Sequence, residues 1–272
     1  MSANQHGDEI NSTNAILYEK RQHIAYITFN RPHRGNALTR EMHTRMRSVW
    51  DDVKRDSGVR CVIVTGAGDR HFSTGGDVGN IAANGRVFAA DGPMSEEVRW
   101  SSHQNHVWKP VIAAVNGLVA GAGLHVVVDA DVIVAAEHAT FMDTHVNVGF
   151  VGAIENIGLS KRLPLGQALR MTLQGRSYRL SAQRAYQLGM VDELVPLEQL
   201  MPTAEEIARE IAKNSPHAVS LSKQAIWGAL EMGYRDAQEY GWALLRMHWA
   251  HPDFREGPRA FAEKREPEWL DE

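Results

Sequence analysis

Residues 111–131 combine small residues with one polar side chain that could do chemistry. The stretch reads VIAAVNGLVAGAGLHVVVDAD, and a helix that begins at Gly121-Ala122-Gly123 would point its free backbone N–H groups at a neighbouring group. Such N–H groups bind an anion or stabilise the oxyanion of a reacting carbonyl. His125 is the one polar residue in the apolar run that follows, and imidazole titrates near neutral pH. The stretch therefore predicts an anion or oxyanion site with a histidine beside it.

The elements around this stretch are expected to alternate between strands and helices. Two β-prone segments at residues 16–19 and 24–29 predict a hairpin, and the apolar runs at 61–65 and 111–115 predict buried strands. Apolar residues recur at helical spacing from Leu38 to Val53, which predicts a helix between the hairpin and the next strand. This alternation is typical of α/β proteins with right-handed crossovers.

The later parts of the chain favour helices. We expect a helix over residues 95–108 that ends before Pro110, and the irregular residues 80–94 are a candidate lid. After a last strand at 191–195, the composition changes near residue 200 to one that predicts helices only. The chain is therefore expected to form an α/β core followed by a helical region.

The composition excludes several kinds of protein. The chain has 272 residues and a formal net charge of −4, which argues against nucleic acid as the main partner. Its single cysteine, Cys61, excludes an internal disulfide and fits a reducing, cytoplasmic location. No apolar run reaches the roughly 18–20 residues of a membrane span, so no membrane partner is expected. The polar residues 1–14 are expected to form a flexible tail.

Several common catalytic motifs are absent from the sequence. Gly66 and Gly68 follow a predicted strand, but His71 stands where the third glycine of a dinucleotide-binding fingerprint belongs. His71 also replaces the first glycine of a GxSxG nucleophile elbow at Ser73, which argues against a serine hydrolase of that type. No short ligand spacing such as HExxH is present, so no metal site is predicted from His125, His138, Asp143 and His145.

Two loops together resemble one known family. The segments HFSTGGDV at residues 71–78 and VNGLVAGAG at 115–123 resemble the two oxyanion-hole loops of the enoyl-CoA hydratase (crotonase) superfamily. Three further segments support the resemblance, namely NRPHRGNAL at 30–38, LSAQRAYQLGMVD at 180–192 and FREGPRAFAEKR at 254–265. These segments occur in the family's order and at its spacing, so the chain is identified as a member of this superfamily.

The resemblance implies an α/β fold built as a spiral of ββα units. Residues 15–200 would form this spiral core, and residues 201–272 would form a helical region that builds a homotrimer or a dimer of trimers. The implied substrate is an acyl-CoA thioester. Because CoA enters as part of that substrate, no separate cofactor is expected.

The resemblance also assigns roles to particular residues. The thioester oxygen is expected to accept hydrogen bonds from the backbone N–H groups of Gly76 and Ala122. Each donor would stabilise the negative charge of the transition state by about 3–4 kcal/mol. The residues expected to contact CoA are Arg34, Ala37, Thr74, Gly76, Asp77, Val78 and Lys264.

The sequence departs from the family at its two acid–base positions. Hydration of an enoyl thioester in this family uses two glutamates, one to deprotonate water and one to protonate the α-carbon. The first position, two residues after the second glycine loop, is His125 here, and the second, after the strand at 140–142, is His145. A pair of imidazoles can hold one neutral base and one cationic acid if their surroundings separate the two pKa values.

Three functions are compatible with this histidine pair. In the first, His125 and His145 carry out acid–base chemistry in a lyase of the enoyl-CoA hydratase/isomerase type. In the second, His145 activates water to hydrolyse a thioester or a C–C bond, as in family members that cleave cyclic β-diketones with a histidine on this loop and an acidic residue after it. Glu155 follows His145 by ten residues and could orient it, as could Asp143. In the third, the chain is a non-catalytic scaffold that binds acyl-CoA.

Overall fold

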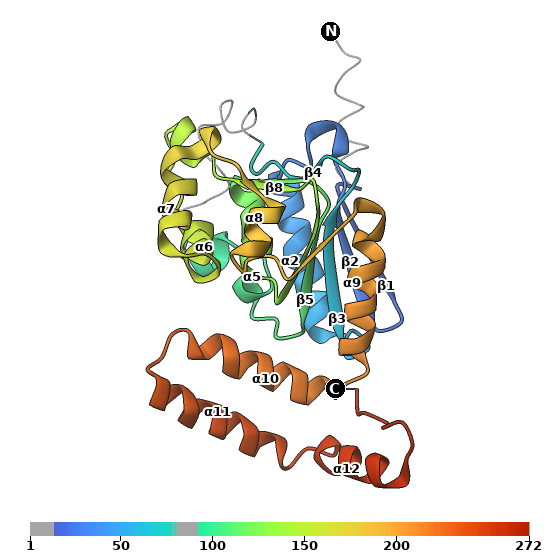
Figure 1. Cartoon of the computed structure of the whole chain (residues 1–272). Helices are drawn as coiled ribbons and strands as arrows, with labels where there is room; N and C mark the ends of the chain where they lie inside the picture. Colours follow the sequence, from blue (N-terminus) through green and yellow to red (C-terminus); the bar gives the residue numbers. More distant parts are fainter. Residues whose placement is uncertain (1–13, 78, 80–91, 272) are drawn as a thin grey trace.

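The computed structural model describes residues 14–77, 79 and 92–271 and contains two sheets (Figure 1). The six-stranded sheet has the order β1 (Ile16–Arg21), β2 (Ile24–Phe29), β3 (Cys61–Gly66), β5 (Val111–Val115), β7 (Val132–Ala136) and β10 (Glu193–Val195). β1 and β2 form the expected antiparallel hairpin, and the other neighbouring strands are parallel. The four-stranded sheet has the order β4 (His71–Ser73), β6 (Leu118–Ala120), β8 (Thr140–Met142) and β9 (Leu180–Ser181).

Successive strands alternate between the two sheets. β3 leads into β4, β5 into β6 and β7 into β8, so each step adds one parallel strand to each sheet. Helices follow these strand pairs, including α5 (Leu124–Asp129) after β6 and α6 (Ile154–Arg162) after β8. This arrangement confirms the expected α/β spiral of ββα units.

The large sheet is covered on both faces, which explains its nearly continuous apolar strands. In β3, Val62 and Val64 join the cluster that contains α2 (Arg40–Arg55). Cys61 and Ile63 point the other way and pack with α9 (Leu197–Ala212). The predicted helix in the 38–53 region is α2. Leu38 lies before its N-cap and is nevertheless buried.

The predicted helix over residues 95–108 is wrong. The structure has only the short α4 (Met94–Glu97) and the 3-10 turn η2 (His103–Asn105) in this segment. Side chains form hydrogen bonds with the backbone N–H and C=O groups that would otherwise pair with each other in a helix. Gln104 Oε1 accepts the N–H groups of Trp100 and Ser101, and Asn105 Nδ2 donates to the carbonyl oxygen of Arg99. Such side-chain-to-backbone bonds compete with helix formation. Most of the candidate lid at 80–94 lies outside the described residues.

Helices make up most of the chain after β8. They are α6, α7 (Leu165–Gln174), α8 (Ala182–Gln187), α9, α10 (Pro216–Ala229), α11 (Tyr234–His248) and α12 (Asp253–Glu263). The predicted division at residue 200 falls inside α9, which packs on the large sheet. α10, α11 and α12 lie together at the end of the molecule away from β4 and β8 (Figure 1). Among the described residues, no helix is long and apolar enough to cross a membrane.

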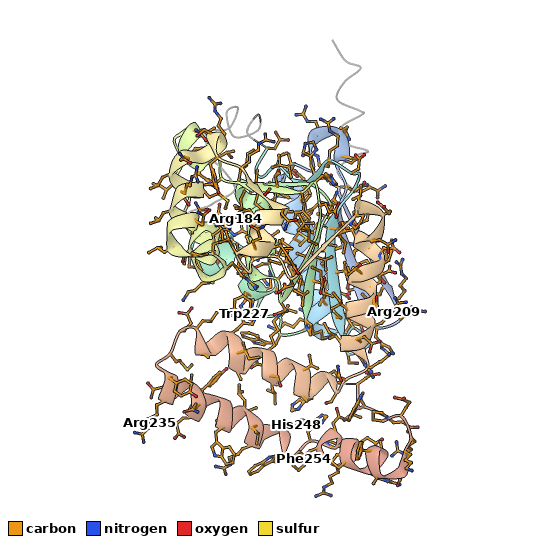
Figure 2. All side chains as sticks on the ribbon, in the orientation of Figure 1. Arg184, Arg209, Trp227, Arg235, His248 and Phe254 are labelled. Atoms are coloured by element: carbon orange, nitrogen blue, oxygen red, sulfur yellow. The ribbon has the colours of Figure 1, made fainter. Side chains whose placement is uncertain are left out.

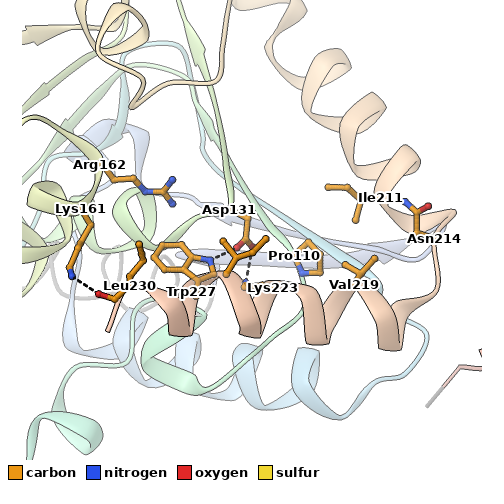
Figure 3. A pocket seen from close by; sticks show the side chains of 11 residues that line it. Pro110, Asp131, Lys161, Arg162, Ile211, Asn214, Val219, Lys223, Trp227 and Leu230 are labelled. Atoms are coloured by element: carbon orange, nitrogen blue, oxygen red, sulfur yellow. Dashed lines mark hydrogen bonds and ion pairs between the residues drawn. The ribbon is translucent and has the colours of Figure 1, made fainter. Parts of the chain in front are cut away.

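One half-buried carboxylate links α10 to the spiral core. Asp131 follows α5 and accepts hydrogen bonds from Lys223 Nζ at 2.7 Å and from Trp227 Nε1 at 2.8 Å (Figure 3). A cavity of about 400 Å³ lies beside these contacts, between α10 and the core. Trp227 therefore docks on its own chain, whereas Trp242 and Trp249 of the helical region are 49% and 43% exposed.

Candidate active site

The fold brings the two predicted oxyanion loops into contact. β4 and β6 are parallel neighbours, so the loop at Gly75-Gly76 and the turn η3 (Gly121–Gly123) leave adjacent strands side by side. Gly75 has φ +86°, and a Cβ atom there would lie 2.8 Å from the carbonyl oxygen of Ala120 and 3.2 Å from the nitrogen of Ala122. Only glycine allows this approach without strain.

The geometry leaves the N–H groups of Gly76 and Ala122 available for a ligand. The β-bridge between Leu38 and Gly76 is made by the N–H groups of Leu38 and Asp77. The N–H group of Gly76 is not used in this bridge. Ala122 is the second residue of η3, and N–H groups at the start of a helix have no acceptor within it. Both residues line one cavity of about 270 Å³. Their role as oxyanion donors stays a prediction.

The segment expected to hold CoA is joined to the first of these loops. Gly35 follows the 3-10 turn η1 (Pro32–Arg34), and its carbonyl oxygen accepts the N–H of Thr74 at 3.0 Å. Leu38 N–H donates to the carbonyl oxygen of Gly75 at 2.8 Å. These bonds hold the 30–38 segment against the loop whose Thr74 and Gly76 line the cavity.

The individual CoA candidates differ in their surroundings. Arg34 is exposed and Ala37 is buried, while Asp77 forms a half-buried ion pair with Arg31 at 3.2 Å. Asp77 therefore holds the turn in place. Lys264 is exposed and caps the end of α12, which lies away from β4 and β8 (Figure 1). Val78 lies outside the described residues. The CoA contacts of these residues stay predictions.

Three predicted catalytic side chains meet at the floor of the cavity. His125 lies in α5, His145 begins the 3-10 turn η4 (His145–Val148), and Glu155 lies in the first turn of α6. Nε2 of His145 is 3.0 Å from Glu155 Oε1, and Nε2 of His125 is 3.5 Å from Glu155 Oε2. All three residues line the same cavity as Gly76 and Ala122. One carboxylate is thus held between two imidazoles.

Gln104 fixes the tautomer of His125. Because Gln104 Oε1 accepts the backbone N–H groups of Trp100 and Ser101, its Nε2 must face the imidazole. That amide donates to His125 Nδ1 at 3.0 Å, so a neutral His125 carries its proton on Nε2, toward Glu155. Burial lowers the pKa of His125, although the charge of Glu155 opposes this shift. His125 is therefore neutral at neutral pH.

Asp143 favours the charged form of His145, whereas burial favours the neutral form of His125. Burial alone would lower the pKa of His145, but the hydrogen bond to Asp143 and the charge of Glu155 outweigh it and raise the pKa. Nδ1 of His145 lies 2.5 Å from Oδ1 of Asp143, which is fully buried and accepts a further hydrogen bond from Asn156 Nδ2. The surroundings of the two histidines therefore separate their pKa values, as a division into acid and base requires.

Sequence reasoning missed Gln104. The sequence predicts a continuous helix over this segment, in which nothing would distinguish Gln104 from any other polar residue. Its role depends on the irregular backbone at Trp100 and Ser101, and no local sequence signal marks that backbone. Asp143, in contrast, was a candidate partner of His145 because it lies two residues before it.

Comparison with known proteins agrees with this fold. Residues 19–272 match the family model described as enoyl-CoA hydratase/isomerase. The chain is 31% identical to (E)-benzylidenesuccinyl-CoA hydratase from Thauera aromatica, over 93% of this chain and 97% of that protein. It is 33% identical to 1,2-epoxyphenylacetyl-CoA isomerase from Escherichia coli, over 93% of this chain and 97% of that protein.

Solved structures show the same relationship. An enoyl-CoA hydratase/isomerase from Mycobacterium paratuberculosis superposes with a TM-score of 0.88 at 38% identity, covering 95% of this chain and 99% of that chain. The chain belongs to the enoyl-CoA hydratase/isomerase family. It is therefore an acyl-CoA-processing enzyme of this family, and the relatives' different reactions leave its own reaction open.

Proposed function

We propose that this enzyme adds water to, or moves a proton within, an acyl-CoA substrate by means of His145, Glu155 and His125. The observation that carries the proposal is the Glu155 carboxylate, held between the Nε2 atoms of the two histidines in the cavity that Gly76 and Ala122 also line. A cationic acid and a carboxylate base then stand side by side next to the oxyanion donors. An acid, a base and oxyanion donors are the groups needed for proton transfer beside a thioester.

Hydration of an enoyl thioester can be written with these groups alone. A water molecule gives a proton to Glu155 as its oxygen bonds to the β-carbon, and the electron pair of the C=C bond moves toward the thioester oxygen. The N–H groups of Gly76 and Ala122 stabilise the resulting enolate. The α-carbon then takes a proton from His145. The proton on Glu155 returns to His145 across their 3.0 Å contact and restores the starting state.

The pH dependence of hydration tests the acid role of His145. The acid form of His145 is present below its pKa and is lost as the pH rises through it. Because that pKa is raised above 6.5, kcat/KM for crotonyl-CoA hydration should stay level to a higher pH than an ordinary imidazole would allow. At higher pH it should fall by about tenfold per pH unit. Stopped assays of 3-hydroxybutyryl-CoA across the pH range measure this profile. A kcat/KM that instead rises with pH would make His145 a base.

Substituting Asp143 tests the cause of the raised pKa. Asp143→Asn removes the charge that favours the His145 imidazolium, so the alkaline fall in kcat/KM should move to lower pH. The same pH profile measures the shift. Asp69→Asn, at an exposed carboxylate, serves as the control and should leave the profile unchanged. An unmoved profile in Asp143→Asn would show that Asp143 has only a structural role.

Hydrolysis is the second candidate function, and the Asp143–His145 pair favours it. A buried carboxylate at 2.5 Å from Nδ1 orients an imidazole as it does in enzymes whose histidine activates a nucleophile. In this reaction neutral His145 would activate water to cleave a thioester or a C–C bond. Product analysis distinguishes the two reactions, because a thioester hydrolase releases free CoA and a hydratase keeps the thioester. Binding of crotonyl-CoA with no product of either kind would instead support the third function, a non-catalytic scaffold that binds acyl-CoA.

Trimer formation and a cytoplasmic location belong to the same proposal. Exposed apolar side chains on the helical region support assembly, since Ile226 is 71% exposed and Phe261 is 87% exposed. Light scattering after gel filtration should give a mass three or six times that of the 30.3 kDa chain. The single Cys61, which is buried, supports the reducing location.

A further inference from the structure

Three histidines meet in the helical region, away from the candidate active site. His217 lies in the first turn of α10, His248 is the last residue of α11, and His251 lies between α11 and α12. Figure 2 shows His248 near Phe254 of α12, and their rings are 6.0 Å apart. Each histidine thus comes from a different part of the helical region. None of them takes part in the reaction proposed above.

The nitrogen atoms of these side chains are close enough to share one ion. Nδ1 of His217 lies 2.9 Å from Nδ1 of His248, and one ligand nitrogen from each of the three residues lies within 4.8 Å of the others. A tetrahedral zinc ion with Zn–N bonds of about 2.0–2.1 Å holds its ligand nitrogens about 3.4 Å apart. The distances between the nitrogen atoms are therefore close to those of a metal site, although the rings must also turn to direct their lone pairs at one ion.

We propose that His217, His248 and His251 bind a divalent transition-metal ion of the zinc type. Imidazole nitrogen is a ligand for Zn²⁺, Cu²⁺ and Ni²⁺, whereas Mg²⁺ and Ca²⁺ require oxygen ligands. Among the described residues, this is the group of three whose ligand atoms converge in this way. A solvent molecule would complete the coordination.

Asp253 supplies the carboxylate that commonly supports a metal-binding histidine. Its Oδ2 lies 3.7 Å from His251 Nδ1 and also accepts a hydrogen bond from Ser215 Oγ at 2.5 Å. The carboxylate is 3% exposed, so it is held in place. In this structure Nδ1 of His251 accepts the backbone N–H of Asp253 at 3.2 Å. Metal binding through Nε2 would therefore move the ring proton to Nδ1 and exchange that bond for one to the Asp253 carboxylate.

Metal binding requires the histidine rings to rotate. The rings of His217 and His251 are stacked 4.1 Å apart with an angle of 7° between their planes, so their in-plane lone pairs cannot converge on one ion. The His248 ring is also nearly parallel to both, at 24° to His217 and 19° to His251, so His217 and His248, which are both only partly buried, must turn. The ion would then link the start of α10 to the junction of α11 and α12. We infer a structural role, in which the metal holds these helices together.

Metal content is the direct test. The untagged full chain is treated with EDTA, incubated with ZnCl2, separated by gel filtration and analysed for zinc by mass spectrometry. We expect one Zn²⁺ per chain in the wild type and none in His217→Ala or His248→Ala, both at partly buried positions. His138→Ala, which removes an exposed histidine of the spiral core, should retain the zinc. Co²⁺ in place of Zn²⁺ should give the visible absorption of a tetrahedral site.

Thermal unfolding provides a second measurement. A hundredfold excess of Zn²⁺ over its dissociation constant should raise the Tm of the wild type by roughly 5 °C and leave that of His248→Ala unchanged. Absence of bound zinc in the wild type would overturn the proposal. So would zinc that stays in both cluster variants but is lost from His125→Ala, because the metal would then belong to the active site.

Discussion

Replacing Glu155 by glutamine is expected to lower kcat for crotonyl-CoA hydration by about 10²–10⁴-fold, the range associated with loss of one acid–base group. The amide keeps the size of the side chain and its place between His125 and His145, but it cannot take a proton from water. Steady-state kinetics measure the loss, and the affinity for crotonyl-CoA should change little because the expected CoA contacts lie elsewhere. A large fall in kcat with little change in binding would place Glu155 in the proton-transfer step.

Glu41→Gln is the matched control for this experiment. Glu41 also lies in the first turn of a helix, so both substitutions remove the same favourable interaction between a carboxylate and a helix N-terminus. Glu41 is exposed, and its substitution should leave kcat unchanged. If Glu155→Gln retained wild-type kcat with an unchanged pH profile, the carboxylate would not be the base. The alternative of a hydrolase based on His145 alone would then gain support.

Replacing Gly75 by alanine is expected to lower kcat/KM by about 10²–10³-fold, the loss associated with one oxyanion donor. The new Cβ would lie 2.8 Å from the carbonyl oxygen of Ala120, and backbone atoms cannot yield as a flexible side chain can. The two loops must then separate, and the N–H groups of Gly76 and Ala122 can no longer both donate to one thioester oxygen. Kinetics with crotonyl-CoA measure the change.

Gly189→Ala separates this effect from backbone strain. Gly189 has φ +79°, close to the +86° of Gly75, but a Cβ atom there would meet nothing within 4 Å. Both variants therefore carry the strain of alanine in a left-handed conformation, so the Tm of both should fall, and Gly75→Ala should lose more because it adds the clash with Ala120. Only Gly75→Ala should lose activity. Equal activity losses in the two variants would show that strain, and not the spacing of the loops, is responsible.

Sequence reasoning succeeded where the signal is local. Buried strands such as β3 and β5 show as short apolar runs between turn residues, and α2 shows as apolar residues at helical spacing. It failed at residues 95–108, where the side chains of Gln104 and Asn105 bind the backbone and prevent the continuous helix. Helical propensity is a weak preference, and hydrogen bonds of this kind override it.

The sequence by itself determined the family and the two glycine loops, and it predicts histidine at both acid–base positions. Each of these depends on residue types at short spacing, which can be recognised before the chain is folded. Only the tertiary structure decided how His125 and His145 differ. Burial favours the neutral form of His125, and Gln104, 21 residues before it, fixes the tautomer of that form. Buried Asp143 favours the cationic form of His145. The physical reason is that a pKa depends on burial and on neighbouring charges, and folding supplies both.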